Sequence, residues 1–434
     1  MVLESFKDQE LSHISYIVGC EKSGKVALVD PARDITPYIE YIHEYGLELE
    51  YVLNTHPHAD FVSGHKQIAE RLNAVNVYCH NVPAAFPFHP VKGDDILSIG
   101  ETVRVRIVET PGHTPFCISF LIEEDGVEKV LFSGDFLFSG GIGRPDLLGE
   151  ETKNNLVEDA YQTCLSLGAL PEHTIVCPSH SGGTMCGKDL KDSYLTTVGI
   201  EKRVNKAFSL ALKDKGAFIE YLASQDIDTP AHFKKMGAIN LQGAGKILNA
   251  ADIPVLRPED AVQKGIQIVD MRDIHAFLGR HIQGSINIAY NANVALIAGS
   301  ILVQEEPYIL LLPETESPKR FLQHILKKLG SVGIDKIVGV VFDGIHRVRQ
   351  KNIALHSVRS ISEDEVRTSG RFKVIELGNE KLDGVDSQKV ELSHIRKYDF
   401  KPDVDYTFIC SNSFKSMAAV SLLQERGNIY FLLR

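Results

Sequence analysis

Directly after the predicted strand Leu49–Asn54, the chain reads Thr55-His56-Pro57-His58-Ala59-Asp60. Two imidazoles and a carboxylate are thereby gathered on a short loop where a strand ends, and side chains on such a loop can converge on one ion. Imidazole nitrogens and carboxylate oxygens are ligands for zinc and iron. The segment therefore predicts a metal site at one edge of a β-sheet.

Two further polar motifs follow predicted strands in the same way. Thr110-Pro111-Gly112-His113-Thr114-Pro115 comes after Val103–Glu109, and Phe132-Ser133-Gly134-Asp135 closes Lys129–Phe132. Histidines that merely cap strands are the alternative interpretation. Donors from three separate strand ends favour a metal site with several ligands.

These three motifs, in this order, resemble the metallo-β-lactamase fold family over roughly the first 230 residues. The resemblance implies an αββα sandwich, in which two sheets lie between layers of helices, as an amino-terminal domain at residues 1–235. Short apolar strands that alternate with amphipathic stretches agree with an α/β fold. The predicted helices are Ile35–Tyr45, Gly64–Leu72 and Thr152–Leu167.

Two kinds of metal chemistry occur in that family. The hydrolases usually hold two zinc ions, and their first motif continues with a histidine after the aspartate, where this chain has Phe61. A phenyl ring cannot coordinate a metal, so a second ion lacks one ligand. The persulfide dioxygenases of the superfamily hold one iron, and their ligands correspond to His56, His113 and Asp135. Two histidines and one carboxylate form the facial arrangement of non-haem Fe(II) oxygenases, so the resemblance implies one Fe(II) per chain.

Other residues are expected to act beside the metal. His58, Asp60 and His180 are predicted to orient ligands, water or substrate without binding the iron. Arg144, in Gly140–Leu147, resembles the arginine of the Gly-Arg-x-Asp segment of persulfide dioxygenases and is a candidate for binding a substrate carboxylate. A loop-shaping pair with Asp146 is the alternative.

One cysteine lies in a segment that resembles bacterial fusion proteins. The run Ser181–Lys188 is similar to a glycine-rich, cysteine-containing segment of metallo-β-lactamase/rhodanese fusions. Cys186 is therefore a candidate for handling sulfur near the iron. The alternative is a small buried apolar residue.

After a predicted connector at Gly237–Asn249, a second α/β unit is expected at residues 254–350. Its segments Ile268–Asp273 and Gly279–Ile288 resemble the first half of a rhodanese domain. The strand Tyr308–Leu312 then runs into Pro313–Ser317, where the family has its catalytic cysteine and this chain has none. The resemblance implies an inactive rhodanese-like domain.

A third unit is expected at residues 358–434, and unlike the second it has a cysteine in the loop where the rhodanese family has its catalytic cysteine. Its early motif has drifted, but Phe408–Ser416 resembles the rhodanese active loop and contains Cys410. In that loop a thiolate lies among backbone N–H groups at a helix amino terminus. Ser413 replaces the usual glycine, and Lys415 replaces the usual arginine and keeps its charge. A decayed domain retained for packing or assembly is the alternative.

The composition excludes several classes of protein. With 44% hydrophobic and 24% charged residues the chain is globular, and its net charge of −11 makes nucleic acid a poor partner. Apolar runs are far shorter than the ~20 residues that span a bilayer. The seven scattered cysteines predict no disulfide framework, and the amino terminus resembles no export signal. A cytoplasmic homo-oligomer without membrane contact is expected.

The order of the three units resembles bacterial persulfide dioxygenase/sulfurtransferase fusions. It implies oxidation of a low-molecular-weight persulfide by O2 to sulfite and thiol, followed by sulfur transfer to sulfite that gives thiosulfate, in sulfide detoxification. A dizinc thioester hydrolase of the glyoxalase II type is the enzymatic alternative. A sulfur carrier or scaffold that uses only the rhodanese-like units is the non-enzymatic one.

Overall fold

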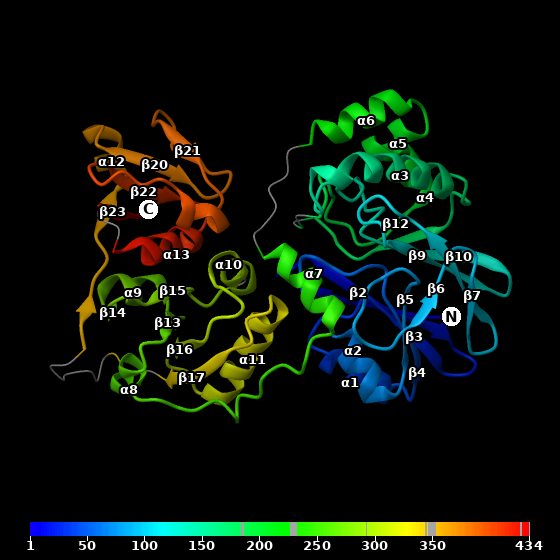
Figure 1. Cartoon of the computed structure of the whole chain (residues 1–434), viewed down its shortest axis with the longest axis horizontal. Helices are drawn as coiled ribbons and strands as arrows, with labels where there is room; N and C mark the ends of the chain where they lie inside the picture. Colours follow the sequence, from blue (N-terminus) through cyan, green and yellow to red (C-terminus); the bar gives the residue numbers. More distant parts are fainter. Residues whose placement is uncertain are drawn as a thin grey trace. The chain divides into compact units, whose positions relative to one another are not determined.

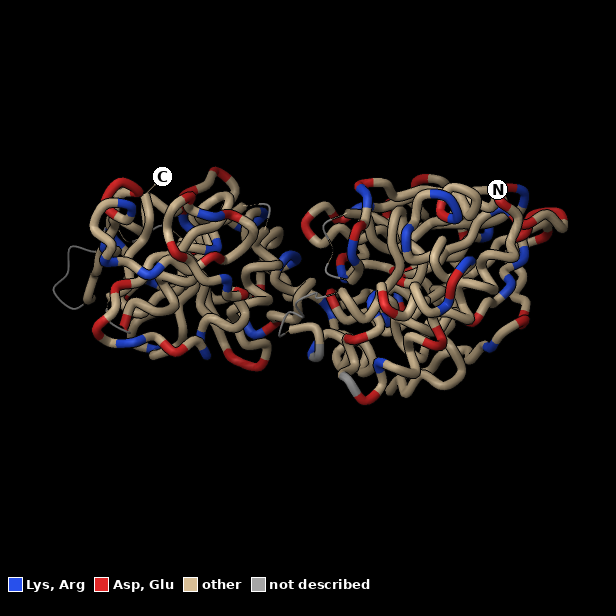
Figure 2. Tube along the Cα trace, turned by 90° about the horizontal axis from the view of Figure 1, so that it is seen from above, with Lys and Arg blue, Asp and Glu red and all other residues tan. Residues whose placement is uncertain are grey.

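The protein, described here by a computed structural model, divides into two compact units. Unit 1 comprises Met1–Thr229 and Phe233–Lys246, and unit 2 comprises Pro230–His232 and Ile247–Arg434. The structure describes residues 1–433 except 183, 185, 226–231, 292, 343–344, 346–352 and 426–427. Figure 2 shows that basic and acidic residues are interspersed along the chain in both units.

The first sheet of unit 1 has the strand order β1–β2–β3–β4–β5–β6. Its strands are β1 (Val2–Asp8), β2 (His13–Cys20), β3 (Lys25–Val29), β4 (Glu48–Leu53), β5 (Val75–Cys79) and β6 (His89–Val91). The first three strands pair antiparallel and the last four parallel. Strands β3 and β4 therefore end at the same edge of the sheet, where the first histidine motif begins.

The second sheet of unit 1 has the order β12–β11–β10–β9–β8–β7. Its strands are β7 (Ile96–Ile99), β8 (Val103–Glu109), β9 (Ile118–Glu124), β10 (Val127–Gly134), β11 (Ile175–Pro178) and β12 (Thr196–Thr197). Strands β10 and β11 are parallel, whereas the other neighbours are antiparallel.

Helices cover the outer face of each sheet. They are α1 (Thr36–Glu44), α2 (His65–Leu72), α3 (Glu150–Gly168), α4 (Val198–Val204), α5 (Lys206–Ala211) and α6 (Lys215–Ala223). Helix α7 (Phe233–Gln242) instead binds the loop of residues 58–63. One apolar core fills the space between the sheets, a second lies under α1 and α2, and a third lies under α3, α5 and α6. The predicted αββα arrangement of the amino-terminal part is confirmed (Figure 1).

Unit 2 begins with a parallel four-stranded sheet in the order β15–β13–β16–β17. Its elements are α8 (Pro258–Gln263), β13 (Gln267–Asp270), α9 (Ile274–Gly279), β15 (Ile286–Asn287), α10 (Val294–Ile301), β16 (Tyr308–Leu312), α11 (Pro318–Ser331) and β17 (Ile337–Phe342). A short antiparallel pair joins β14 (His281–Ile282) to β18 (Leu355–His356).

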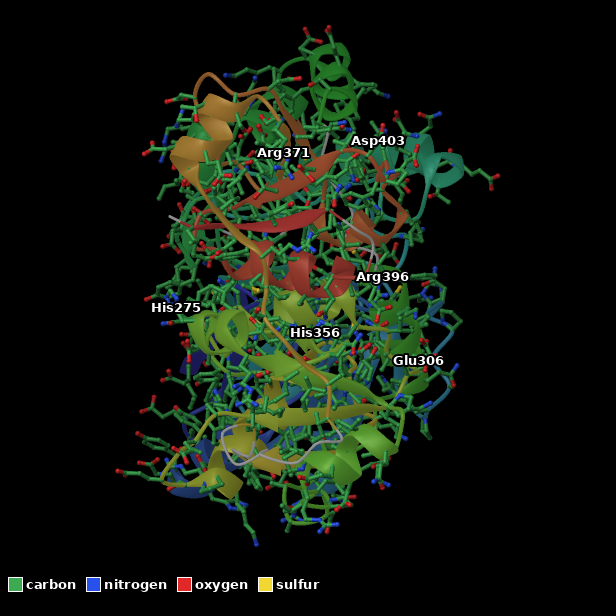
Figure 3. The ribbon with its side chains drawn as sticks, turned by 90° about the vertical axis from the view of Figure 1, so that its left-hand side faces the viewer. His275, Glu306, His356, Arg371, Arg396 and Asp403 are labelled. Carbon is green, nitrogen blue, oxygen red and sulfur yellow. The ribbon has the colours of Figure 1, made fainter. Side chains whose placement is uncertain are left out.

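The second sheet of unit 2 is parallel, with the order β19–β23–β22–β20–β21. Its elements are β19 (Ser360–Ser362), α12 (Glu363–Ser369), β20 (Phe372–Glu376), β21 (Ser387–Lys389), the 3₁₀ helix η2 (Leu392–Lys397), β22 (Asp405–Ile409), α13 (Phe414–Leu423) and β23 (Ile429–Leu433). Arg371, which is labelled in Figure 3, pairs with Asp405, the first residue of β22. Within unit 2, α13 also packs on β15, where the Asn287 amide donates to Ser421 Oγ at 2.9 Å.

The predicted connector is wrong in its first part. Residues 237–242 belong to helix α7, and the predicted domain end at residue 235 falls inside that helix. Met236 and Asn240 are only 0% and 1% exposed, and their helix is part of unit 1. This burial outweighs the low helix propensity of Gly237. The predicted end of the second domain, residue 350, lies outside the described residues.

Within the described residues, none of the helices combines the length and the apolar character needed to cross a bilayer. That the parallel sheets of unit 2 are rhodanese-like domains stays a prediction.

Candidate metal centre

Three strand ends of unit 1 meet at one buried point. His56 follows β4, His113 follows β8 and Asp135 follows β10, and all three are 1% exposed. Nε2 of His56 and Nε2 of His113 each lie 3.7 Å from Oδ2 of Asp135. Gly134 makes this approach possible, because with φ of +53° a Cβ there would lie 2.5 Å from Thr55 Oγ1.

Hydrogen bonds orient both imidazoles. Thr55 Oγ1 donates to Asp30 Oδ2 at 2.7 Å, so it accepts from Nδ1–H of His56 at 3.0 Å. Nδ1–H of His113 donates to the Arg144 carbonyl at 2.9 Å. Each Nε2 atom therefore carries its lone pair toward Asp135.

The atoms that face one another here form no hydrogen bond to any residue that the structure describes. Nε2 of His56, Nε2 of His113 and Oδ2 of Asp135 are buried without a hydrogen bond among the described residues. Asp135 Oδ1 is occupied separately, since it accepts from Ser179 Oγ. Two lone pairs and a carboxylate oxygen that face one another without a donor suit a cation between them. The residues thus fit a metal ion, and they form a His/Asp metal-binding site.

The protonation states suit that role. Burial keeps the pKa of His56 well below its ordinary value and also lowers the pKa of His113, so both rings are neutral. Burial opposes ionisation of Asp135, but its neighbours, His180 foremost, hold the pKa of this carboxyl below the usual range. Neutral imidazoles and an ionised carboxylate are the forms that bind metals.

A second cluster shares Asp135 with the first. Its members are His58, Asp60, Asp135 and His180, all buried. Nε2 of His180 lies 3.1 Å from Asp60 Oδ2 and 3.5 Å from Asp135 Oδ1. Burial raises the pKa of Asp60, which favours a protonated carboxyl in the metal-free protein.

His58 is held by Asp30. Its Nε2 lies 3.2 Å from Asp30 Oδ1. Although burial opposes protonation of His58, the carboxylate of Asp30 raises its pKa to about 8. The same carboxylate binds the Thr55 amide at 2.8 Å, so Asp30 supports the loop of His56 and His58 from below.

Phe61 and His13 close the side of the second cluster. Their rings lie 4.0 Å apart, and the Phe61 ring lies 4.5 Å from His58. Nε2 of His13 is buried and has no hydrogen bond among the described residues. An apolar ring and an imidazole whose Nε2 has no hydrogen bond in the described part of the chain thus stand beside His180.

Two other predicted site residues lie next to the metal centre. The Arg144 guanidinium is 1% exposed and makes two 2.6 Å bonds to Asp146. This pair is the one that the alternative interpretation of Arg144 expects. Its substrate-binding role stays a prediction. Cys186 is buried, and burial raises the pKa of its thiol well above the ordinary value, with Asp60 and Asp135 adding to the effect. Gly183 and Met185 of that segment lie outside the described residues.

The predicted sulfur-transfer loop lies between β22 and α13 in unit 2. Sγ of Cys410 accepts from the Ser416 hydroxyl at 3.1 Å and from the Ser416 amide at 3.4 Å. The cysteine is 4% exposed, and Ser413 has φ of +64°, in the region that favours the expected glycine. Lys415 is half-buried and is the second residue of α13.

Sequence reasoning missed three residues of this site. Asp30 directly follows β3 at the same sheet edge as His56, so the search for polar residues at strand ends that located the histidines could have found it. His13 carries no motif signal. Asn240 contacts a loop almost 180 residues earlier in the chain, and local patterns hold no information about such a contact.

The comparisons with known proteins agree with this fold and site. Residues 9–180 match the metallo-beta-lactamase superfamily. The hydroxyacylglutathione hydrolase of Klebsiella pneumoniae is 32% identical over 221 residues, 48% of this chain and 82% of that protein. This chain belongs to the metallo-beta-lactamase superfamily.

Two solved structures are also similar. A metallo-beta-lactamase from Staphylococcus aureus is 31% identical with a TM-score of 0.69, covering 79% of this chain and 99% of its own. ETHE1 from Myxococcus xanthus is 27% identical with a TM-score of 0.49, covering 56% and 100%. Unit 1 is little more than half of the chain, so the match to the S. aureus structure extends into unit 2.

Proposed function

We propose that unit 1 is an Fe(II)-dependent dioxygenase that oxidises a low-molecular-weight thiol persulfide to sulfite. The observation that carries the proposal is a complete triad of two histidines and one carboxylate beside Phe61. The triad has the composition of a facial non-haem iron site. Phe61 stands where the dizinc hydrolases have a ligand, which favours one metal over two.

The proposed reaction is RSSH + O2 + H2O → RSH + SO3²⁻ + 2H⁺. Four electrons pass from the persulfide sulfur to dioxygen, and the S–S bond breaks. Fe(II), when bound by His56, His113 and Asp135, supplies the redox chemistry that lets O2 react with a closed-shell sulfur compound.

Neighbouring residues have separate tasks in this proposal. His180, whose Nε2 lies 3.1 Å from Asp60 Oδ2, takes up a proton that the reaction releases, and Asp60 orients this imidazole. Phe61 covers their flank with an apolar ring, which limits the access of water. The Asp30–Thr55 pair keeps the His56 lone pair aimed at the metal.

Unit 2 is proposed to use the sulfite. The Cys410 thiolate takes the outer sulfur of RSSH and releases RSH, and sulfite then removes that sulfur as S2O3²⁻ and regenerates the thiolate. The amide and hydroxyl donors of Ser416 stabilise an anionic sulfur at this position. Lys415 adds a positive charge at the same helix end.

A dizinc thioester hydrolase is the second candidate. Two observations favour it: the identity to a hydroxyacylglutathione hydrolase, and the four-residue cluster His58, Asp60, Asp135 and His180 beside the triad. Such an enzyme needs a second metal that activates water.

Metal analysis together with two assays separates these candidates. The full chain is purified without oxygen, and its iron and zinc are measured by mass spectrometry. O2 uptake with glutathione persulfide and hydrolysis of S-lactoylglutathione are then compared. We expect one iron per chain, O2 uptake and no thioester hydrolysis.

His113→Ala should lose both the iron and the O2 uptake, because it removes one of three ligands. His89→Ala is the matched control, since His89 is exposed on β6. Two zinc ions per chain with thioester hydrolysis would overturn the dioxygenase in favour of the hydrolase.

A further inference from the structure

Helix α7 carries one buried amide that binds three backbone groups of the metal loop. Nδ2 of Asn240 donates to the carbonyls of His58 and Phe61, each at 2.8 Å. Its Oδ1 accepts from the Ser63 amide at 2.8 Å. Asn240 is 1% exposed, and all three of these bonds go to residues 58–63. We call this set of three bonds the clamp.

The clamp acts on one half of the metal centre. Residues 58–63 carry His58 and Asp60, two members of the second cluster, and Phe61, whose ring lies beside it. His56 lies before this segment, and Thr55 and Asp30 hold it independently. Residues 30 and 31, directly after β3, therefore hold His56, His58 and Ser63. Helix α7 adds the bonds to the two backbone carbonyls on either side of Asp60.

We infer that Asn240 is a positioning residue of the metal centre, which holds Asp60 and Phe61 in place beside the metal without contributing to metal retention. The inference makes α7 part of the active unit rather than a linker. Its activity readout rests on the proposed function, whereas its backbone readout does not.

Two substitutions in the full chain separate hydrogen bonding from packing. Asn240→Asp keeps the shape and the acceptor for Ser63, but it points a carboxylate oxygen at two carbonyl oxygens. Asn240→Ala removes all three bonds and leaves space for a water molecule that can donate to the two carbonyls. Gln242→Glu is the matched control, because it makes the same amide-to-acid change at an exposed position of α7.

We expect all variants to retain wild-type iron. The kcat/KM for O2 uptake should fall about 10- to 100-fold in Asn240→Asp and less in Asn240→Ala, as for outer residues that orient metal sites. Exchange of the Ser63 amide, followed by mass spectrometry of peptides spanning residues 56–66, should accelerate in Asn240→Ala and stay slow in Asn240→Asp. Gln242→Glu should match the wild type in every measurement.

If Asn240 only stabilises the fold, the two variants should rank differently. Asn240→Asp would then be the milder variant, and both would lower only the melting temperature at unchanged kcat/KM. That result, or unchanged Ser63 exchange in Asn240→Ala, overturns the inference. If Asn240→Asp does not fold, Asn240→Ala alone still decides through iron content and Ser63 exchange. If no variant or wild type consumes O2 but Ser63 exchange behaves as expected, the proposed function fails and the clamp stands.

Discussion

Asp30 and His58 form a buried ion pair directly beneath the metal loop. Because Asp30 raises the pKa of His58 from 6.5 to about 8, the charged imidazole stabilises the metal-free fold by about 2 kcal/mol. The pKa is higher in the folded protein, so this contribution is complete below pH 6.5. It is lost as the pH rises through about 8.

We predict that His58→Ala destabilises the metal-free protein more at pH 6 than at pH 9, as measured by urea unfolding. In the iron-loaded protein the same variant should keep most of its metal and lose activity. Asp30→Asn should abolish the pH dependence of the difference. Complete loss of iron in His58→Ala would make His58 a ligand.

Phe61 decides the number of metal ions in the proposed function. Its ring is 0% exposed and adjoins His58 and His180. Imidazole is smaller than phenyl and fits the same space, so Phe61→His supplies the ligand that the dizinc enzymes have. We predict that this variant binds a second metal ion, which metal analysis after equilibration with excess zinc will detect.

Phe61→Leu is the control for that substitution, because leucine removes the ring but cannot coordinate. It should bind one ion, as the wild type does. Equal metal content in all three proteins would show that position 61 does not set the stoichiometry.

At the scale of elements, the turn from β22 into α13 places Cys410 against the start of a ten-residue helix. We predict that Cys410→Ser leaves O2 uptake unchanged and shifts the product from thiosulfate toward sulfite, because an alcohol cannot carry sulfane sulfur. Sulfite and persulfides also react without a catalyst. Initial rates at low sulfite are therefore compared by chromatography of both anions.

Cys186→Ser is the partner experiment. The raised pKa of the buried Cys186 thiol opposes a thiolate role, so thiosulfate formation should persist in this variant. If Cys186→Ser instead abolishes it while Cys410→Ser does not, sulfur transfer belongs to unit 1.

For the whole molecule, the proposed function assigns the two reactions to different units. Removing iron by anaerobic chelation should abolish O2 uptake but leave thiosulfate formation from persulfide and added sulfite, because Cys410 needs no metal. Restoring Fe(II) should restore O2 uptake. Loss of both activities on chelation would contradict separate sites.

Much of unit 1 could be predicted from local patterns. Strand β8 has the predicted bounds Val103–Glu109, and the histidine and aspartate motifs lie at strand ends as expected. The alternation of apolar residues and the polar residues at strand ends are properties of neighbouring residues, so the sequence alone predicts them. The short strand β5, with a polar Asn76 among its buried residues, left no such pattern.

The metal triad was predictable because three motifs each indicate one ligand at a strand end. His56 follows a strand of the first sheet, and His113 and Asp135 follow strands of the second, so the packing of the two sheets brings them together. The clamp of Asn240 was not predictable, because the glycines and asparagines of residues 237–249 are a local pattern typical of a connector. Only the tertiary structure places that amide 2.8 Å from the backbone carbonyls of residues 58 and 61. Hydrogen bonds between distant segments depend on how the layers pack, and packing is a property of the complete fold.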